Sequence, residues 1–267
     1  MVEKSTPSSG TASGTGVDKG RHGVAGSLET AMEHQRAGRL GEAAAICHDI
    51  VQRYPDHVGA LNVLGLVEVQ NGQPLQAMTH FAKALVGDPT NSALYANMGL
   101  ALGAIGRRDE AIETFEKAIH LRADYREAHH NVSVLLRDAG RLGDAERHAR
   151  QSIALAPDLP DTHSVLGTIL EAAGRTAEAL AEYRTTVMLA PNHVPGLTHL
   201  GTLLGDLDQP EEAVEHLQRA VTLQPRAAQA RLRLVETLRR LGRGQDAETV
   251  LWGAPRELSC RAVTVSL

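Results

Sequence analysis

The sequence predicts an all-α fold built as a stacked array of helix-turn-helix units, and three periodic observations predict it. An alanine returns every 34 residues, a glycine lies five residues before six of these alanines, and a proline lies twelve residues after five of them. The alanines are Ala43, Ala77, Ala111, Ala145, Ala179, Ala213 and Ala247. A fixed period of this length is typical of a solenoid rather than of a single globular core.

The period divides the chain into segments. Residues 1–23 are rich in Ser, Thr and Gly and predict a disordered tail, because so little apolar surface cannot offset the entropy cost of ordering. Six repeats of two helices each are expected at 24–57, 58–91, 92–125, 126–159, 160–193 and 194–227. A degenerate seventh repeat, or cap, covers 228–255, where Pro255 shortens the second helix, and a short tail covers 256–267.

The first helix of a repeat is easiest to justify in 58–91. Leu61, Leu64 and Gly65 lie one helical turn apart and form one packing face. Gly72 then suits the left-handed residue that ends a helix. Pro74 follows at a position that fits the first turn of the next helix, so a tight helix-turn-helix is expected.

The second helix of the same repeat places Ala77, Phe81 and Ala84 on one stripe, and Pro89 ends it. Small residues in both helices predict a close approach of the two backbones. In the first helix a glycine recurs at Gly65, Gly99, Gly167 and Gly201. Ser133 and Val235 break this pattern, so slightly wider helix pairs are expected in the fourth and seventh repeats.

These residues resemble the tetratricopeptide repeat, a helix-turn-helix unit of 34 residues. The best match is the series Leu61, Leu64, Gly65, Gly72, Ala77, Phe81, Ala84 and Pro89. The resemblance implies a right-handed superhelical solenoid of about seven antiparallel helix pairs. It also implies that each first helix lines a concave groove and that each second helix forms the convex back.

Composition narrows the function classes. The net charge of -5 and an aromatic content of 3% argue against nucleic-acid binding, which usually needs a basic surface. No apolar run is long enough to span a membrane and no signal peptide is evident, which predicts a cytoplasmic protein without membrane insertion. Cys47 and Cys260 lie in the first and last repeats, so no disulfide between them is expected.

The groove is the expected functional surface, because polar residues on the first helices are not needed for packing. The candidate partner-binding residues are Asn62, Asn97, His130, Asn131, Arg137, Thr168, Glu171, Thr202, Arg233, Arg239 and Arg240. Asn97 and Asn131 occupy equivalent places. In the repeats of protein O-GlcNAc transferases an asparagine ladder at this place holds peptide backbone, and an amide can both donate and accept. Ordinary polar residues on a wet face are the alternative interpretation.

Arginine collects near the C-terminal end, which makes an acidic partner segment a candidate. A solvated cap is the alternative interpretation. His129 and His163 are equivalent in adjacent repeats and could lie near one another. Packing histidines are favoured over a metal site, because no third ligand is evident.

No nucleophile elbow, zinc-protease helix or phosphate loop is present, so no catalytic residue and no cofactor are expected. The sequence therefore predicts a non-catalytic scaffold that binds an extended protein or peptide segment in its groove. Two alternatives stay open. One is an accessory portion of an O-GlcNAc-transferase-like glycosyltransferase, and the other is a self-assembling homo-oligomer.

Overall fold

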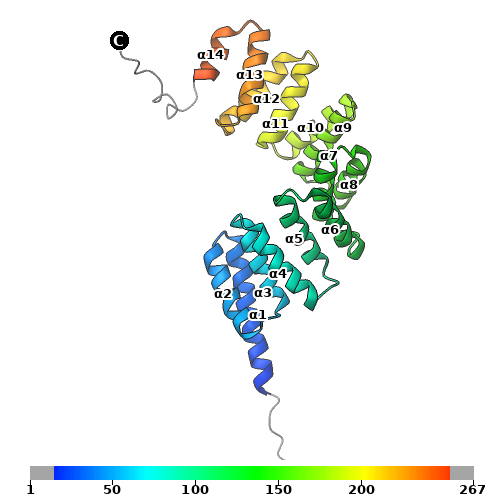
Figure 1. Cartoon of the computed structure of the whole chain (residues 1–267). Helices are drawn as coiled ribbons and strands as arrows, with labels where there is room; N and C mark the ends of the chain where they lie inside the picture. Colours follow the sequence, from blue (N-terminus) through cyan, green and yellow to red (C-terminus); the bar gives the residue numbers. More distant parts are fainter. Residues whose placement is uncertain (1–14, 253–267) are drawn as a thin grey trace, which may run out of the picture. The chain divides into compact units, whose positions relative to one another are not determined.

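The computed structural model describes residues 15–252, and side chains from residue 24 onward. Within this range it contains fourteen α-helices and no strand (Figure 1). The first six helices are α1 (Thr15–Arg36), α2 (Leu40–Arg53), α3 (Val58–Gln70), α4 (Pro74–Gly87), α5 (Ser92–Ala104) and α6 (Arg108–Leu121). The predicted all-α fold of helix-turn-helix repeats is confirmed.

The remaining helices are α7 (Arg126–Asp138), α8 (Leu142–Leu155), α9 (Pro160–Ala172), α10 (Thr176–Leu189), α11 (Val194–Asp206), α12 (Pro210–Leu223), α13 (Ala228–Arg240) and α14 (Gly244–Trp252). The chain divides into two compact units. Unit 1 ends at Ala123 and contains α1 to α6, and unit 2 begins at Asp124 and contains α7 to α14.

The N-terminal boundary differs from the expected one. Helix α1 begins at Thr15, so residues 15–23 are helical rather than part of a disordered tail. Once the packed part of α1 has formed the first turns, each further residue adds a hydrogen bond at little cost, which lets the helix extend beyond its core contacts. Residues 1–14, Pro255 and the predicted tail 256–267 lie outside the described residues.

A left-handed residue ends the first helix of each repeat. Gly72 has φ 74°, and the N–H of Gln73 donates to the carbonyl oxygen of Glu68 at 2.8 Å, which closes the end of α3. Asp208, with φ 59°, is the one residue other than glycine with positive φ in the described part of the chain. The turn chemistry expected from the glycine period is therefore present.

The helices of each unit form two layers. Every first helix contacts the next first helix of its unit, as in the pairs α3–α5 and α9–α11. Among the described residues, the second helices lie farther apart and are bridged by long side chains, as where Arg184 on α10 donates to Glu212 on α12 at 3.2 Å. Because the first helices lie closer together, each unit curves toward them. We call the solvent-facing surface of these first helices the first-helix face. It consists of α3 and α5 in unit 1 and of α7, α9, α11 and α13 in unit 2.

Close helix packing depends on matched side-chain sizes. A methyl group at Gly99 would lie 2.8 Å from the ring of Phe115, so the absence of a side chain on α5 makes room for the aromatic ring on α6. In the fourth repeat Ala149 takes the place of the aromatic residue and Ser133 takes the place of the glycine. The smaller partner leaves room for the serine, whose hydroxyl donates to the carbonyl oxygen of His130 at 2.6 Å, so Ser133 does not require a wider helix pair.

Candidate functional site

The first-helix face of unit 1 carries a pair of asparagines. The Asn97 side-chain amide on α5 donates to the Asn62 carbonyl oxygen on α3 at 2.7 Å, and both residues are half-buried. This bond orients both amides. It leaves the Asn62 NH₂ as a donor and the Asn97 carbonyl as an acceptor, and neither group has another hydrogen-bond partner among the described residues.

The surroundings of this pair are uncharged. Helix α5 contains no charged residue, and α3 contains one, Glu68, whose carboxylate lies 3.1 Å from His80 Nε2 on α4. Leu66 is half-buried and Leu100 is exposed on the same helices. The face of unit 1 therefore offers amide hydrogen bonds in an aliphatic surrounding.

Unit 2 contains a polar cavity of about 250 Å³ between α7, α9 and α11, which we call the histidine cavity. It is lined by His130, Arg137, Asp161, Ser164, Val165, Thr168, His193, Pro195 and His199. Three of the candidate residues meet here. Arg137 Nη1 donates to Thr168 Oγ1 at 3.0 Å, and His130 Nδ1 lies 3.1 Å from Thr162 Oγ1.

Two histidines of the cavity have lowered pKa values. Burial lowers the pKa of His130, and the charges of Arg126 and Arg137 lower it further, against an opposing effect of Asp161. Burial also lowers the pKa of His199, and Arg137 adds to that effect. Both rings are therefore neutral at neutral pH.

Glu171, another candidate, holds an aromatic ring in place. The Tyr183 hydroxyl on α10 donates to Glu171 Oε2 at 2.7 Å. Burial, this hydrogen bond and the carboxylate charge raise the pKa of Tyr183 well above its usual range. The ring of Tyr183 in turn stacks on His199, with centroids 5.3 Å apart and planes at 12°. Glu171 thus does not line the histidine cavity but orients Tyr183, which packs against His199 of the lining.

His193 has a defined tautomer. The N–H of Gly196 donates to His193 Nδ1 at 3.0 Å, so the ring proton of the neutral form is on Nε2. That nitrogen lies 2.8 Å from Asp161 Oδ1 and donates to it. His193 therefore both caps the start of α11 and links α11 to α9.

A second cavity of about 450 Å³ lies between α11 and α13. Its lining includes the candidates Thr202, Arg233, Arg239 and Arg240. Two of the three arginines are already engaged. Arg240 donates to the Gly205 carbonyl oxygen at 2.6 Å and to Asp208 at 2.9 Å, and Arg233 donates to Glu236 at 3.2 Å. Arg240 thus closes the end of α11, whereas Arg233 pairs within α13.

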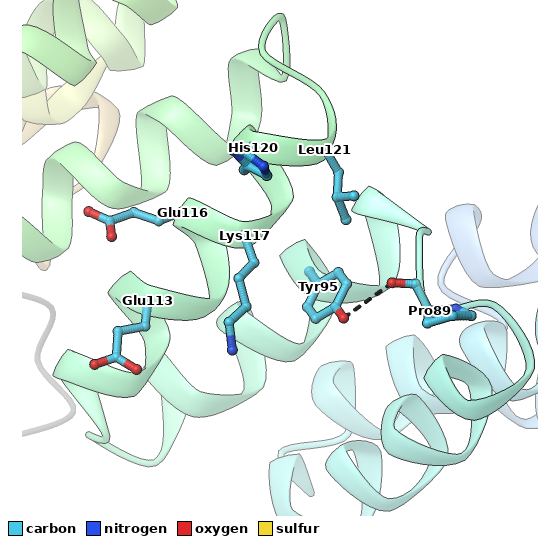
Figure 2. Close-up of a pocket in the computed structure, with 7 residues that line it drawn as sticks. All are labelled: Pro89, Tyr95, Glu113, Glu116, Lys117, His120 and Leu121. Carbon is cyan, nitrogen blue, oxygen red and sulfur yellow. Dashed lines mark hydrogen bonds between the residues drawn. The ribbon is translucent and has the colours of Figure 1, made fainter.

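A larger cavity, of about 560 Å³, lies away from the candidate residues, on α6 and the start of α5. Figure 2 shows its lining, with the Tyr95 hydroxyl directed at the Pro89 carbonyl oxygen, to which it donates at 3.2 Å. Lys117 and two glutamates of α6 complete one wall. This cavity contains none of the residues that the sequence singled out for binding.

The remaining candidates are placed as follows. Asn131 lies half-buried on α7 and does not line the histidine cavity. His129 pairs with His148 of its own repeat, and His163 pairs with Glu182 at 2.7 Å. In the part of the chain whose side chains are described, no three His, Cys, Asp or Glu side chains converge as metal ligands.

Sequence reasoning missed Thr162 and His193. His193 lines the histidine cavity and Thr162 holds the ring of His130, and no local signal marks either role, since both depend on how the helices stack. Cys47 is buried and free, and burial raises its pKa to about 11, while Cys260 lies outside the described range. None of the helices described here combines the length and the apolar character needed to cross a bilayer.

Comparisons with known proteins agree with this architecture. Hsp70-Hsp90 organising protein of Plasmodium falciparum is 34% identical over 65 residues, which are 24% of this chain and 26% of that protein. The chain therefore spans about a quarter of that relative. The Cut9-Hcn1 structure of the APC/C matches with a TM-score of 0.72 at 18% identity, over 83% of this chain and 44% of that one.

Two further structures share the fold. PilF of Pseudomonas aeruginosa matches with a TM-score of 0.72 at 16% identity, over 82% of this chain and 98% of that one. YrrB, described as a TPR protein with an unusual peptide-binding site, matches with a TM-score of 0.55 at 18% identity, over 69% of this chain and 95% of that one. A family model, Tetratricopeptide repeat, matches residues 28–92, 97–160, 134–193 and 199–256. The chain belongs to the tetratricopeptide repeat family.

Proposed function

We propose that this chain is a non-catalytic scaffold that binds an extended segment of another protein along its first-helix face. The observation that carries the proposal is the hydrogen bond between Asn97 and Asn62. It leaves one amide as donor and the other as acceptor, which complements the C=O and N–H groups of a peptide backbone. Such a pair can hold an extended chain whatever its side chains are.

The surroundings of the pair support an uncharged segment in unit 1. Leu66 and Leu100 offer aliphatic contacts, and α5 has no charge that would select an ionic side chain. Because the repeats bury their cores against one another, this face is formed before the partner arrives, and little ordering cost falls on the scaffold. The peptide-binding site named for YrrB is a property of that protein, and its likeness in fold is consistent with this proposal.

A peptide-display selection on the full chain tests the proposal. Short random peptides are selected at neutral pH, and the affinity of the best binders is measured for the wild type and for Asn97→Ala. The variant should bind them at least about fivefold more weakly, because the loss of a hydrogen-bond partner typically costs about 1 kcal/mol or more. Circular dichroism checks that the variant is folded.

Asn71→Ala is the matched control, because Asn71 is an exposed asparagine at the end of α3. It should bind the selected peptides as the wild type does. Selected peptides whose affinity is the same for Asn97→Ala and for the wild type would show that they bind elsewhere, and the proposal would fall.

The glycosyltransferase alternative has one observation in its favour, the equivalent positions of Asn97 and Asn131 in α5 and α7. Incubation of the purified chain with a sugar nucleotide and an acceptor peptide tests it. Transfer at an enzymatic rate would replace the scaffold proposal, and its absence in the presence of peptide binding would support the scaffold. Sedimentation of the chain with and without residues 1–23 tests the self-assembly alternative.

A further inference from the structure

The histidine cavity of unit 2 differs in chemistry from the asparagine pair of unit 1. We propose that it is a second binding site, which takes a glutamate or aspartate side chain of a partner segment, and that His130 and His199 take up protons as that carboxylate binds. This inference rests on the proposed function, since it assumes that a partner segment lies over the first helices of unit 2.

The charge of the cavity is determined by its histidines. Arg137 and Asp161 are the only permanently charged residues in its lining, and their charges cancel. The other lining residues are uncharged except for three histidines. The cavity is therefore close to neutral while His130 and His199 are neutral and becomes positive when they protonate.

His130 has a ring nitrogen available for a ligand. Its Nδ1 is paired with Thr162 Oγ1 on α9, which leaves Nε2 for the cavity. The charged groups that act on this ring are Arg126 and Arg137 of α7, which disfavour its protonation, and Asp161 of α9, which favours it. A carboxylate placed against Nε2 would add to the effect of Asp161 and stabilise the imidazolium.

His199 forms the opposite part of the lining, on α11. Stacking on Tyr183 fixes the plane of its ring. Glu171 of α9 favours its protonation, whereas Arg137 of α7 and His193 at the start of α11 disfavour it. Burial is the main reason that the ring stays neutral in the free protein, because it removes the water that would stabilise the imidazolium. A carboxylate that enters the cavity would stabilise the imidazolium instead.

Arg137 supplies the fixed positive charge. Its Nη1 donates to Thr168 and its Nε and Nη2 donate to Asp138, so the guanidinium is held in one orientation. A guanidinium has five N–H donors, and these bonds leave some of them for a ligand. The arginine therefore offers N–H donors to a carboxylate at any pH, while Asp138 and Asp161 balance its charge, so that protonation of the two histidines decides the affinity.

The test uses a tetraglutamate peptide that is acetylated and amidated, so that its side chains carry the only carboxylates. Its affinity for the full chain is measured at about pH 7.5 and about pH 5.5, where glutamate is still mostly ionised. We expect binding several-fold tighter at the lower pH, because each histidine whose pKa rises by one unit on binding contributes a gain of up to about tenfold. Calorimetry in buffers of different ionisation enthalpy should show proton uptake by the wild type.

Substitutions test whether His130 and His199 are the groups that take up protons on binding. The double variant His130→Gln with His199→Gln should lose the gain at low pH, and circular dichroism checks that it is folded. His216→Gln is the matched control, because His216 lies on the second helix α12 of the same unit and outside the cavity. It should keep the full gain. A tetraglutamine peptide of the same design should show no gain.

The inference is overturned by a wild-type affinity that does not change with pH, by a gain that persists in the double variant, or by an equal gain for tetraglutamine. Calorimetry on the wild type needs no variant, so an unfolded double variant does not leave the proposal untested. Uncharged library peptides that bind through Asn97, together with tetraglutamate that gains nothing on acidification, would overturn this inference and leave the proposed function standing.

Discussion

His129 Nδ1 lies 2.9 Å from His148 Nδ1 in the buried core of the fourth repeat, and the surroundings fix the direction of this hydrogen bond. Arg147 Nη2 lies 3.1 Å from His148 Nε2, and a guanidinium can only donate, so Nε2 of the neutral ring is an acceptor. The proton of His148 is therefore on Nδ1 and is donated to His129. Protonation of either ring breaks one of these bonds.

Acid should destabilise the protein through this pair. Burial, with Arg147 and His129 adding to it, lowers the pKa of His148 to about 4, below its usual value of about 6.5. Because the folded state favours the neutral ring, its contribution is complete above about pH 6.5 and is lost as the pH falls toward 4, by about 1–3 kcal/mol. Urea unfolding at several pH values measures it. His148→Leu should lose less stability on acidification than the wild type, and an equal loss in both would assign the acid effect to other groups.

Overpacking the helix contact at Ala111 should destabilise unit 1. Ala111 is fully buried on α6, so Ala111→Leu has to push the neighbouring helix away, at a cost of about 1–3 kcal/mol. Ala45→Leu on α2 is the control, because Ala45 is exposed. Thermal unfolding of both variants checks this, and equal melting temperatures would show that the alanine period does not mark the close contacts.

The sizes of Ser133 and Ala149 should be coupled. Ala149→Phe alone should destabilise by about 1–3 kcal/mol, because Ser133 occupies the space that a glycine leaves free opposite an aromatic ring in other repeats. Adding Ser133→Gly should recover a large part of that loss. A double-mutant cycle of unfolding free energies measures the coupling, and strictly additive effects would mean that the two sites do not share one space.

Asp208 should respond differently to two small substitutions. Asp208→Gly removes the cost of a side chain at φ 59° but also the ion pair with Arg240, so it should be neutral or slightly stabilising. Asp208→Ala keeps the strained backbone and loses the ion pair, and it should destabilise by about 1 kcal/mol. Chemical denaturation measures the unfolding free energy of both variants. Equal values would show that the positive φ at position 208 does not destabilise a residue with a side chain.

Much of the fold could be predicted from the sequence because each helix end carries a local signal. Gly72 and its equivalents have positive φ where the period placed them, and first helices begin at Val58, Ser92 and every 34 residues thereafter. The prediction that the disordered tail extends to residue 23 was wrong, because α1 begins at Thr15. Composition describes the tendency of residues 15–23 alone and not their continuity with a packed helix.

The partners within the sites were harder to predict. Residues at equivalent places in adjacent repeats are separated by the helix spacing of about 8–10 Å, so His129 and His163 are poorly placed to pair with one another. Each instead pairs with a residue 19 positions later, in the second helix of its own repeat, namely His148 and Glu182. The Asn62–Asn97 bond depends on the lateral register of α3 and α5, which no local signal specifies.

The second helices approach one another through ion pairs such as that of Arg184 on α10 with Glu212 on α12, and part of their surface takes no part in packing. Val86 on α4 and Met188 on α10 are 85% and 72% exposed there. A cysteine introduced at either position would give an attachment point for a fluorophore or a sensor surface, since Cys47 is buried and poorly reactive, provided that Cys260 is first replaced. The chain could then be immobilised through a second helix, with the proposed binding surface on the first helices left open to solution.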